Sequence, residues 1–138
     1  MWTVFTSKGI PMVAFTGAFS GMSSNDIAAS RKFYEEALGL TVTDAGMGNI
    51  MIEVGAGDLI LVYPKDDHVP ATYTILNFEV EDIDAAVDDL ASKGVVMEQY
   101  GMPHQDAKGI ARGKASNQGP DIAWFLDPAG NILSVLSN

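Results

Sequence analysis

The stretch NDIAAS at residues 25–30 recurs in similar form as EDIDAA at residues 81–86, 56 positions later. Each copy follows an apolar, strand-like run and opens a segment with helical spacing that ends at a glycine, Gly39 or Gly94. Asp26 leads the first helix, where a short acidic side chain caps free backbone N–H groups. A repeated order of strand, helix and hairpin predicts two pseudo-equivalent modules with a cleft between them.

The segments around the repeat complete two copies of the same order. Glycine and proline residues mark the turns between these segments, most clearly in the DPAGN turn at residues 127–131. A polar stretch bracketed by prolines, residues 64–71, indicates a linker between the modules. Two helices are predicted, one from Asp26 to the glycine at 39 and one at 82–93, and a short strand or tail is predicted before residue 12. Strands are predicted at 12–22, 40–44, 49–54, 59–63, 72–80, 95–100, 121–126 and 132–136.

The composition excludes several functional classes. The chain has 138 residues, 47% of them hydrophobic, which suits one domain with a real core. Its net charge is −10, from 18 acidic and 8 basic residues, so it should repel nucleic acid and anionic membranes. No cysteine is present, which excludes disulfides and thiolate sites. No run approaches the roughly 20 apolar residues of a membrane span, and the start lacks the order of a signal peptide. We therefore expect a cytoplasmic protein.

Three segments, residues 25–40, 78–87 and 123–133, together resemble the vicinal oxygen chelate superfamily, which includes glyoxalases, bleomycin resistance proteins and extradiol dioxygenases. The resemblance implies an α+β fold in which two βαβββ modules form paired half-barrels around a cleft. It covers nearly the whole chain, read as a single domain over 1–138 with modules at 12–64 and 72–138 and a linker at 65–71. Many members are homodimers that complete or exchange these clefts, so we expect a homodimer.

Metal-dependent members hold a divalent ion through four strand positions, which the resemblance assigns here to Phe19, Leu61, Ile75 and Ser134. Three of these side chains have no lone pair to donate, and an isolated serine hydroxyl is a poor metal ligand. The two histidines, His68 and His104, fall in loops in this interpretation. The chain is therefore interpreted as a divergent member without the metal ligands and without a cofactor. A displaced site using His104 with Asp106 or Asp121 stays open as an alternative.

The cleft should then be an apolar pocket for a small molecule, with a few polar groups that orient the ligand. Aromatic and methionine side chains on its walls suit a planar or partly aromatic ligand. Some of these residues are equally expected as ordinary core. The candidate ligand-binding residues are Phe19, Met51, Leu61, Tyr63, Ile75, Asn77, Tyr100, Trp124 and Ser134.

The long segment 101–120 contains three of the eight basic residues, Lys108, Arg112 and Lys114, and several glycines. It is a candidate for a mobile lid that offers positive charge to an anionic group. The alternative is a solvated crossover loop with ordinary surface cations.

Two functional classes follow. The first is a metal-independent protein that binds a small, partly aromatic molecule, similar to the bleomycin-binding type. The second is an enzyme, either a metal-dependent lyase or dioxygenase with non-standard ligands, or a metal-free isomerase. Metal-free catalysis needs a general base, for which Glu53, Glu79 and His104 are candidates by residue type only, so the catalytic residues stay unknown. A pure interaction module is a third, weaker hypothesis, because paired modules build a cavity.

Overall fold

A computed structural model describes residues 3–5, 11–55 and 57–138 of the chain. Strands and helices alternate as the repeat predicts. No helix in these ranges is long and apolar enough to cross a bilayer. The elements are β1 (Thr3–Phe5), β2 (Pro11–Val13), β3 (Ser20–Ser24), α1 (Ile27–Lys32), the π-helical turn η1 (Phe33–Ala37), β4 (Thr41–Gly46), β5 (Asn49–Val54), β6 (Asp58–Pro64), β7 (Thr74–Glu79), α2 (Ile83–Ser92), β8 (Ala111–Arg112), β9 (Asp121–Leu126) and β10 (Ile132–Ser137).

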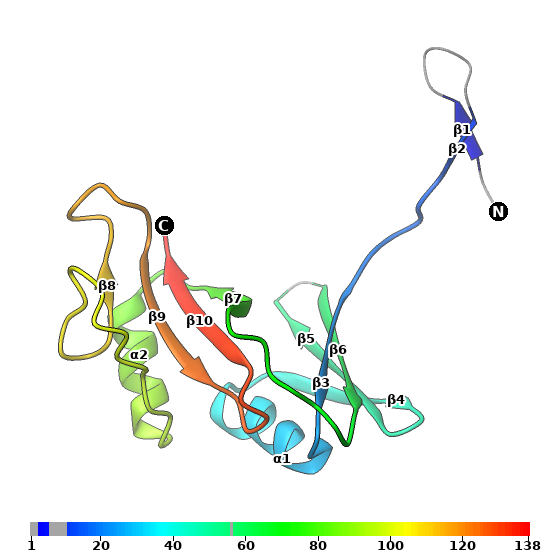
Figure 1. The fold of residues 1–138 in the computed structure, drawn as a ribbon, viewed down its shortest axis with the longest axis horizontal. Helices are drawn as coiled ribbons and strands as arrows, with labels where there is room; N and C mark the ends of the chain where they lie inside the picture. The colour runs from blue at the N-terminus through cyan, green and yellow to red at the C-terminus, as the bar shows by residue number, and fades with distance from the viewer. Residues whose placement is uncertain (1–2, 6–10, 56) are drawn as a thin grey trace.

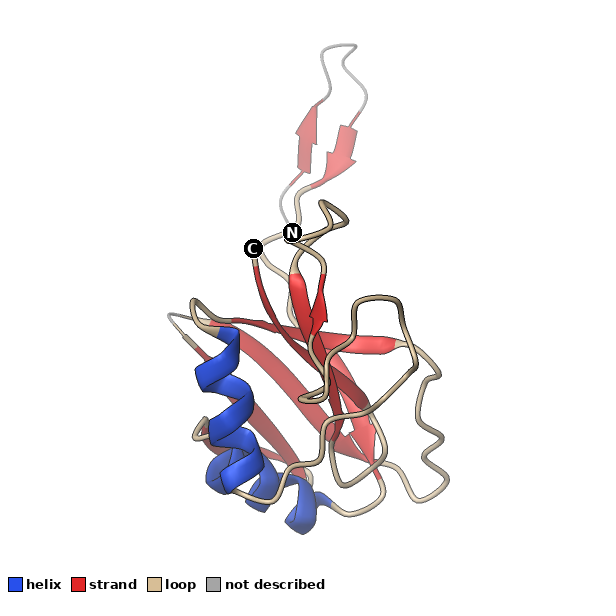
Figure 2. Cartoon of the chain, turned by 90° about the vertical axis from the view of Figure 1, so that its left-hand side faces the viewer, coloured by secondary structure: helices blue, strands red, loops and turns tan. Residues whose placement is uncertain are grey.

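The two main sheets have the same internal order. The first sheet runs β3-β6-β5-β4 and the second runs β7-β10-β9-β8 (Figure 1). In each sheet the first and last strands of the module are parallel neighbours, and the other pairs are antiparallel. The helices lie on one side of the strands, as Figure 2 shows. This arrangement confirms the predicted α+β fold with two βαβββ modules.

Both helix starts follow the prediction from the repeated sequence. The side chains of Asp26 and Asp82 accept hydrogen bonds from the backbone N–H groups of Ala29 and Ala85, each at 3.0 Å. These bonds satisfy donors that the first turn of a helix leaves free. After the first helix Gly39 adopts a φ of 67°, a left-handed conformation that glycine adopts without strain.

The core lies between the helices and one face of each sheet. Alternate residues of the strands point inward, for example Ile50 and Ile52 on β5 and Phe125 on β9, all almost fully buried. Phe33 of the first module contacts Phe125 of the second, with ring centroids 6.4 Å apart. One cluster therefore contains apolar side chains of both modules, and the opposite faces of the two sheets stay free of helices.

The predicted strand over residues 12–22 is wrong in its middle. Residues 14–19 have no regular structure; β2 ends at Val13 and β3 begins at Ser20. β2 pairs with β1 in a small hairpin apart from the main sheets (Figure 1). This pairing confirms a short extra strand at Thr3–Phe5, whereas residues 1, 2 and 6–10 lie outside the described part of the chain.

The predicted strand at residues 95–100 is also absent, and β8 is the fourth strand of the second sheet instead. One backbone bond joins this segment to β9, from the Glu98 N–H to the Trp124 carbonyl at 2.8 Å, and a side chain takes two other backbone groups. Gln105 Nε2 donates to the carbonyls of Glu98 and Gly109 at 2.9 and 3.0 Å, and Gln105 Oε1 accepts from the N–H of Tyr100 at 3.0 Å. Backbone groups that are paired with a side chain do not form the ladder of a regular strand.

Candidate ligand-binding site

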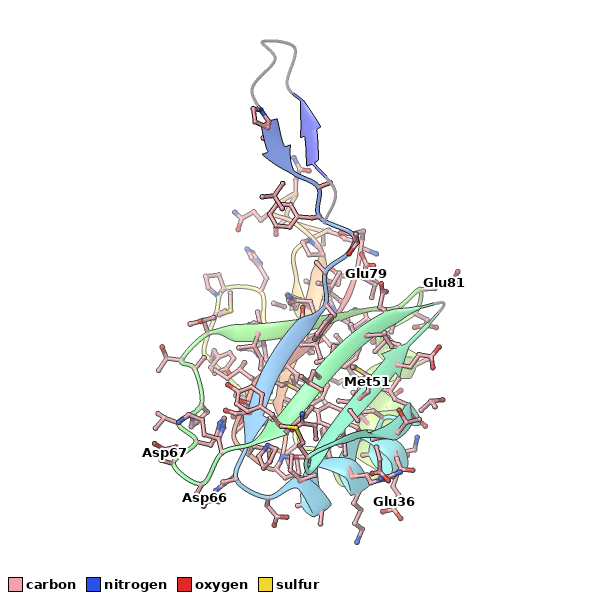
Figure 3. All side chains as sticks on the ribbon, turned by 90° about the vertical axis from the view of Figure 1, so that its right-hand side faces the viewer. Glu36, Met51, Asp66, Asp67, Glu79 and Glu81 are labelled. Atoms are coloured by element: carbon pink, nitrogen blue, oxygen red, sulfur yellow. The ribbon has the colours of Figure 1, made fainter. Side chains whose placement is uncertain are left out.

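Each sheet has an open face, the face opposite the helices. On the first sheet Leu61 pairs with Gly21 on one side and Met51 on the other, which forms a row across three strands. Tyr63 lies two residues further along the same face and is 41% exposed. Figure 3 views this sheet from its open side and labels Met51. Predicted site residues Met51, Leu61 and Tyr63 therefore share one apolar surface.

The equivalent row on the second sheet contains polar and aromatic side chains. Ser134 pairs with Asn77 on β7 and with Trp124 on β9. Leu133 and Val135, its neighbours along β10, point into the core and are buried. The structure thus brings Asn77, Trp124 and Ser134 together, in the positions that Gly21, Met51 and Leu61 occupy in the first sheet. This row combines a ring, a hydroxyl and an amide.

Hydrogen bonds fix the side chains of this second row. Ser134 Oγ donates to Asn77 Oδ1 at 2.5 Å, and Trp124 Nε1 donates to Thr74 Oγ1 at 3.1 Å. The second bond draws the indole across β10 toward β7. Tyr100 adds a ring edge to Trp124, with centroids 5.5 Å apart and planes at 66°. Partial burial raises the pKa of the Tyr100 hydroxyl, and the charge of Glu98 adds to this rise.

A cavity of about 1040 Å³ is lined by one member of this row, Asn77, whereas Ser134 and Trp124 are not among its lining residues. Its walls come from the segment before β3, the turn between β5 and β6, and β7. It contains the predicted residues Phe19 and Asn77, and its ionisable lining residues are Asp58 and Glu79. Figure 3 shows Glu79 near the same end of the molecule as Glu81. Phe19 is 64% exposed, so this wall is open in the single chain.

The four positions assigned to metal ligands do not fit a divalent ion. Phe19 lines the cavity, Leu61 and Ser134 occupy the centres of the two rows, and Ile75 on β7 also packs against the core. Three of the four side chains lack a donor atom, and the Ser134 hydroxyl already binds Asn77. Within residues 3–5, 11–55 and 57–138, no three His, Cys, Asp or Glu side chains form a group that could hold a metal.

The two histidines serve other contacts. His68 lies between the modules, with Nδ1 2.6 Å from Ser23 Oγ and Nε2 3.0 Å from the carbonyl of Ala129. His104 adopts a positive φ of 66°, and its carbonyl accepts a hydrogen bond from the Arg112 N–H at 3.0 Å. His68 is thus a bridging group, and His104 shapes the loop that carries Arg112.

The cations of the candidate lid contact side chains of the second module. Lys108 lies 3.2 Å from Asp84 and 2.8 Å from Asp88, both on α2. Arg112 binds Asp84 through both terminal nitrogens, and Lys114 Nζ donates to Ser137 Oγ at 2.9 Å. Hydrogen bonds from Arg112 hold the pKa of the Asp84 carboxyl well below its usual range. Movement of a lid would have to break these contacts, so the lid stays a prediction.

Sequence reasoning missed a buried polar network that joins the modules. Tyr34 in η1 donates its hydroxyl hydrogen to Asp127 Oδ2 at 2.6 Å. Asn131 Nδ2 donates to the same oxygen at 3.0 Å and to the carbonyl of Ser23 at 3.2 Å. Burial raises the pKa of Tyr34, so its hydroxyl stays protonated as the donor. The DPAGN motif is the sequence signal for this network, but by itself the motif predicts only a turn.

The fold resembles many solved structures. The integron cassette protein HFX_CASS4, from the mobile metagenome of a Halifax Harbour sewage outfall, is 19% identical with a TM-score of 0.66 over 90% of this chain and 100% of that one. Lactoylglutathione lyase from Agrobacterium tumefaciens is 17% identical, with a TM-score of 0.62 over 89% and 94%. The fosfomycin resistance protein FosX from Listeria monocytogenes is 14% identical, with a TM-score of 0.66 over 92% and 95%.

These identities are low, so the solved structures support the fold alone. No curated protein matches the chain. A family model described as glyoxalase/bleomycin resistance protein/dioxygenase superfamily matches residues 13–135, nearly the whole chain. The paired βαβββ modules are the architecture that the sequence resemblance implied. The chain belongs to the glyoxalase/bleomycin resistance protein/dioxygenase superfamily.

Proposed function

We propose that this protein binds a small, partly aromatic molecule in an apolar cleft without the help of a metal ion. The observation that carries the proposal is the chemistry of the four positions that the resemblance assigns to metal ligands. Where metal-dependent relatives need donors, this chain has Phe19, Leu61 and Ile75, and a serine whose hydroxyl binds Asn77. Aromatic rings and a few fixed polar groups remain, and these are typical of ligand pockets.

The rings of the open faces support an aromatic ligand. Tyr100 and Trp124 form an edge-to-face pair beside the polar row, and Phe19 and Tyr63 add exposed ring surface from the first module. Aromatic pairs of this kind gain about 0.5–1.5 kcal/mol beyond their buried area. A planar ligand placed against these rings would gain from the same interaction.

We also propose that the working form is a homodimer. Members of this superfamily bind small molecules and often form dimers. In the single chain Phe19, Tyr63 and Tyr100 are 64%, 41% and 48% exposed, and a second copy would cover part of this apolar surface. Light scattering after size-exclusion chromatography measures the mass directly. The cytoplasmic location stays a prediction.

Thermal unfolding with and without additives tests the binding function. Ni²⁺, Zn²⁺, Mn²⁺ and Fe²⁺ should leave Tm unchanged, whereas a panel of small aromatic compounds should contain members that raise it, because a ligand that binds only the folded state stabilises it. Trp124→Ala should abolish the aromatic shifts. Tyr73→Ala changes an exposed residue directly before β7 and should leave the aromatic shifts in Tm unchanged. A bound ion at one per chain, with turnover that depends on it, would contradict the proposal.

The alternative is a metal-dependent lyase or dioxygenase with non-standard ligands. One observation favours it: Asp58 and Glu79 place carboxylates in the cavity that also contains Phe19 and Asn77. Carboxylate and amide oxygens are metal ligands. Under this alternative Glu79→Gln would abolish both metal binding and turnover, whereas the binding proposal expects neither to exist.

A further inference from the structure

We propose that Asn77 selects the ligand, and that the ligand is a planar aromatic molecule carrying an uncharged oxygen that accepts hydrogen bonds. The inference rests on the proposed binding function and names the ligand class. It derives from the row formed by Asn77, Ser134 and Trp124, which combines a ring with an oriented amide.

The orientation of the Asn77 amide follows from the burial of Ser134. The Ser134 side chain is fully buried at 0% exposure, so its hydroxyl hydrogen needs an acceptor within the protein. Asn77 Oδ1, at 2.5 Å, is that acceptor. With the amide reversed, Asn77 Nδ2 would donate to Ser134 Oγ and the hydroxyl hydrogen would lack this acceptor. Ser134 therefore positions Asn77.

This orientation leaves the Asn77 amino group available. Asn77 is exposed, and in the described part of the chain no side chain or backbone group hydrogen-bonds to its Nδ2. The amino group has two N–H donors and no acceptor. The site thus offers hydrogen-bond donors at this point, and a ligand gains by placing an acceptor there.

A ring surface lies on the same sheet as these donors, and its hydrogen-bond partner Thr74 is three residues before Asn77 on β7. Trp124 is two strands away from Asn77, which is about 10 Å between backbones at the usual strand spacing. The bond from Trp124 Nε1 to Thr74 on β7 carries the indole back over β10 toward the strand of Asn77. A ligand ring that stacks on the indole would therefore place a substituent near the Asn77 amide.

The surrounding charge determines which kind of acceptor is favoured. Glu79 lies two residues beyond Asn77 on the same face of β7, and Asp58 lines the same cavity. The residues lining this cavity include no lysine or arginine. Negative charge near the amide opposes a carboxylate or phosphate at this position. An uncharged oxygen, such as a ketone or amide carbonyl, can accept a hydrogen bond from Asn77 without being repelled by the nearby negative charge.

Three naphthalene probes of similar size test this inference by equilibrium dialysis. The probes are 2-acetylnaphthalene, its isosteric hydrocarbon 2-isopropenylnaphthalene, and 2-naphthoate. We expect the ketone to bind about fivefold more tightly than the hydrocarbon, the ratio that one uncharged hydrogen bond of about 1 kcal/mol gives. We expect the carboxylate to bind more weakly than the ketone. Binding should shift the NMR signal of the Trp124 indole N–H.

Variants then assign the preference to Asn77. Asn77→Asp keeps the acceptor for Ser134 but removes both donors, so the ketone should lose its advantage while hydrocarbon binding shows that the site is intact. Ser134→Ala should reduce the advantage, because the amide loses its anchor. Asn25→Asp, an exposed position before α1, makes the same charge change away from the site and should keep the wild-type ratio.

The outcomes separate this inference from the proposed function. Equal binding of ketone and hydrocarbon by the wild type, or an unchanged ratio in Asn77→Asp, would overturn the inference and leave the binding function intact. Tightest binding of 2-naphthoate would overturn the assignment of an uncharged acceptor. Failure of all three probes to bind would count against the binding function and this inference together.

Discussion

Replacing Tyr34 with phenylalanine removes one hydroxyl group from the contact between the two modules. The ring of Tyr34 is fully buried, and its hydroxyl donates to Asp127 Oδ2 at 2.6 Å. Phenylalanine keeps the ring and its edge contact with Phe33, at a centroid distance of 5.3 Å. The change therefore removes this hydrogen bond between residues 93 positions apart, together with a weaker contact of the hydroxyl with Met22 Sδ at 3.9 Å.

The expected loss follows from the partners that Asp127 retains. A hydrogen bond to a charged group contributes about 1.5–3 kcal/mol. Asp127 keeps three other donors, the backbone N–H groups of Ala129 and Asn131 and the side chain of Asn131, at 2.9–3.0 Å. Three hydrogen bonds therefore still stabilise its carboxylate, so we expect the loss in free energy of unfolding to lie toward the lower end of this range. We expect the free energy of unfolding to fall by about 2 kcal/mol.

Urea unfolding followed by circular dichroism, at one protein concentration for all variants, measures this loss. The midpoint should fall with an unchanged slope, because little surface is altered. Tyr73→Phe is the matched control: Tyr73 is 69% exposed, and its change should stay within about 0.5 kcal/mol. If the two variants unfold at the same urea concentration, the hydrogen bond does not stabilise the module contact and the reasoning is refuted.

Three further predictions follow. Hydrogen bonds from Arg112 lower the pKa of Asp84 below its ordinary 3.8. The stability from this charge is therefore fully present above about pH 3.8 and is lost as the pH falls toward the lowered pKa, so the difference between wild type and Asp84→Asn in urea unfolding should be full at pH 5 and smaller at pH 2. Ser30→Ala removes one of two buried hydroxyls that lie 2.7 Å apart, and urea unfolding should show a loss of about 1 kcal/mol. Gly113→Ala would bring a Cβ within 2.9 Å of the Gly119 carbonyl, and its Tm should fall by several degrees, equivalent to about 1–3 kcal/mol.

Local sequence signals predicted most of the fold. The caps at Asp26 and Asp82 and the stop at Gly39 each depend on residues a few positions away. The alternation of β5, with Ile50 and Ile52 buried, is equally local. These features could be read from the sequence because their causes lie within one turn or one strand.

The errors arose where distant groups decide the structure. Residues 95–100 have the composition of a strand, but the side chain of Gln105 bonds to the Glu98 carbonyl and the Tyr100 N–H, and only the Glu98 N–H bonds to β9. Arg112 also binds Asp106 nearby, but its contact with Asp84, 28 residues earlier, was not predicted. No spacing rule connects such pairs, because only the folded chain brings them together.

The candidate site shows the same division. The repeat placed Trp124 and Met51 on equivalent strands, and their pairing with Ser134 and Leu61 supports that equivalence. The hydrogen bond between Ser134 and Asn77 was not predicted, because the two residues are 57 positions apart. Under the proposal for Asn77 this bond orients the amide that selects the ligand, and only the folded chain brings the two residues together.

The contact between Tyr34 and Asp127 also breaks the internal symmetry of the chain. By the offsets of the repeat, the counterparts of these residues are Leu90 and Val54, which line one apolar cavity of about 250 Å³. Two first modules from different chains, paired in this way, would set the Tyr34 hydroxyl against Val54, and two second modules would set Asp127 against Leu90. The first mismatch would leave the Tyr34 hydroxyl without its acceptor, and the second would cost Asp127 one of its four donors. The asymmetry therefore favours pairing of a first module with a second module over pairing of two identical modules.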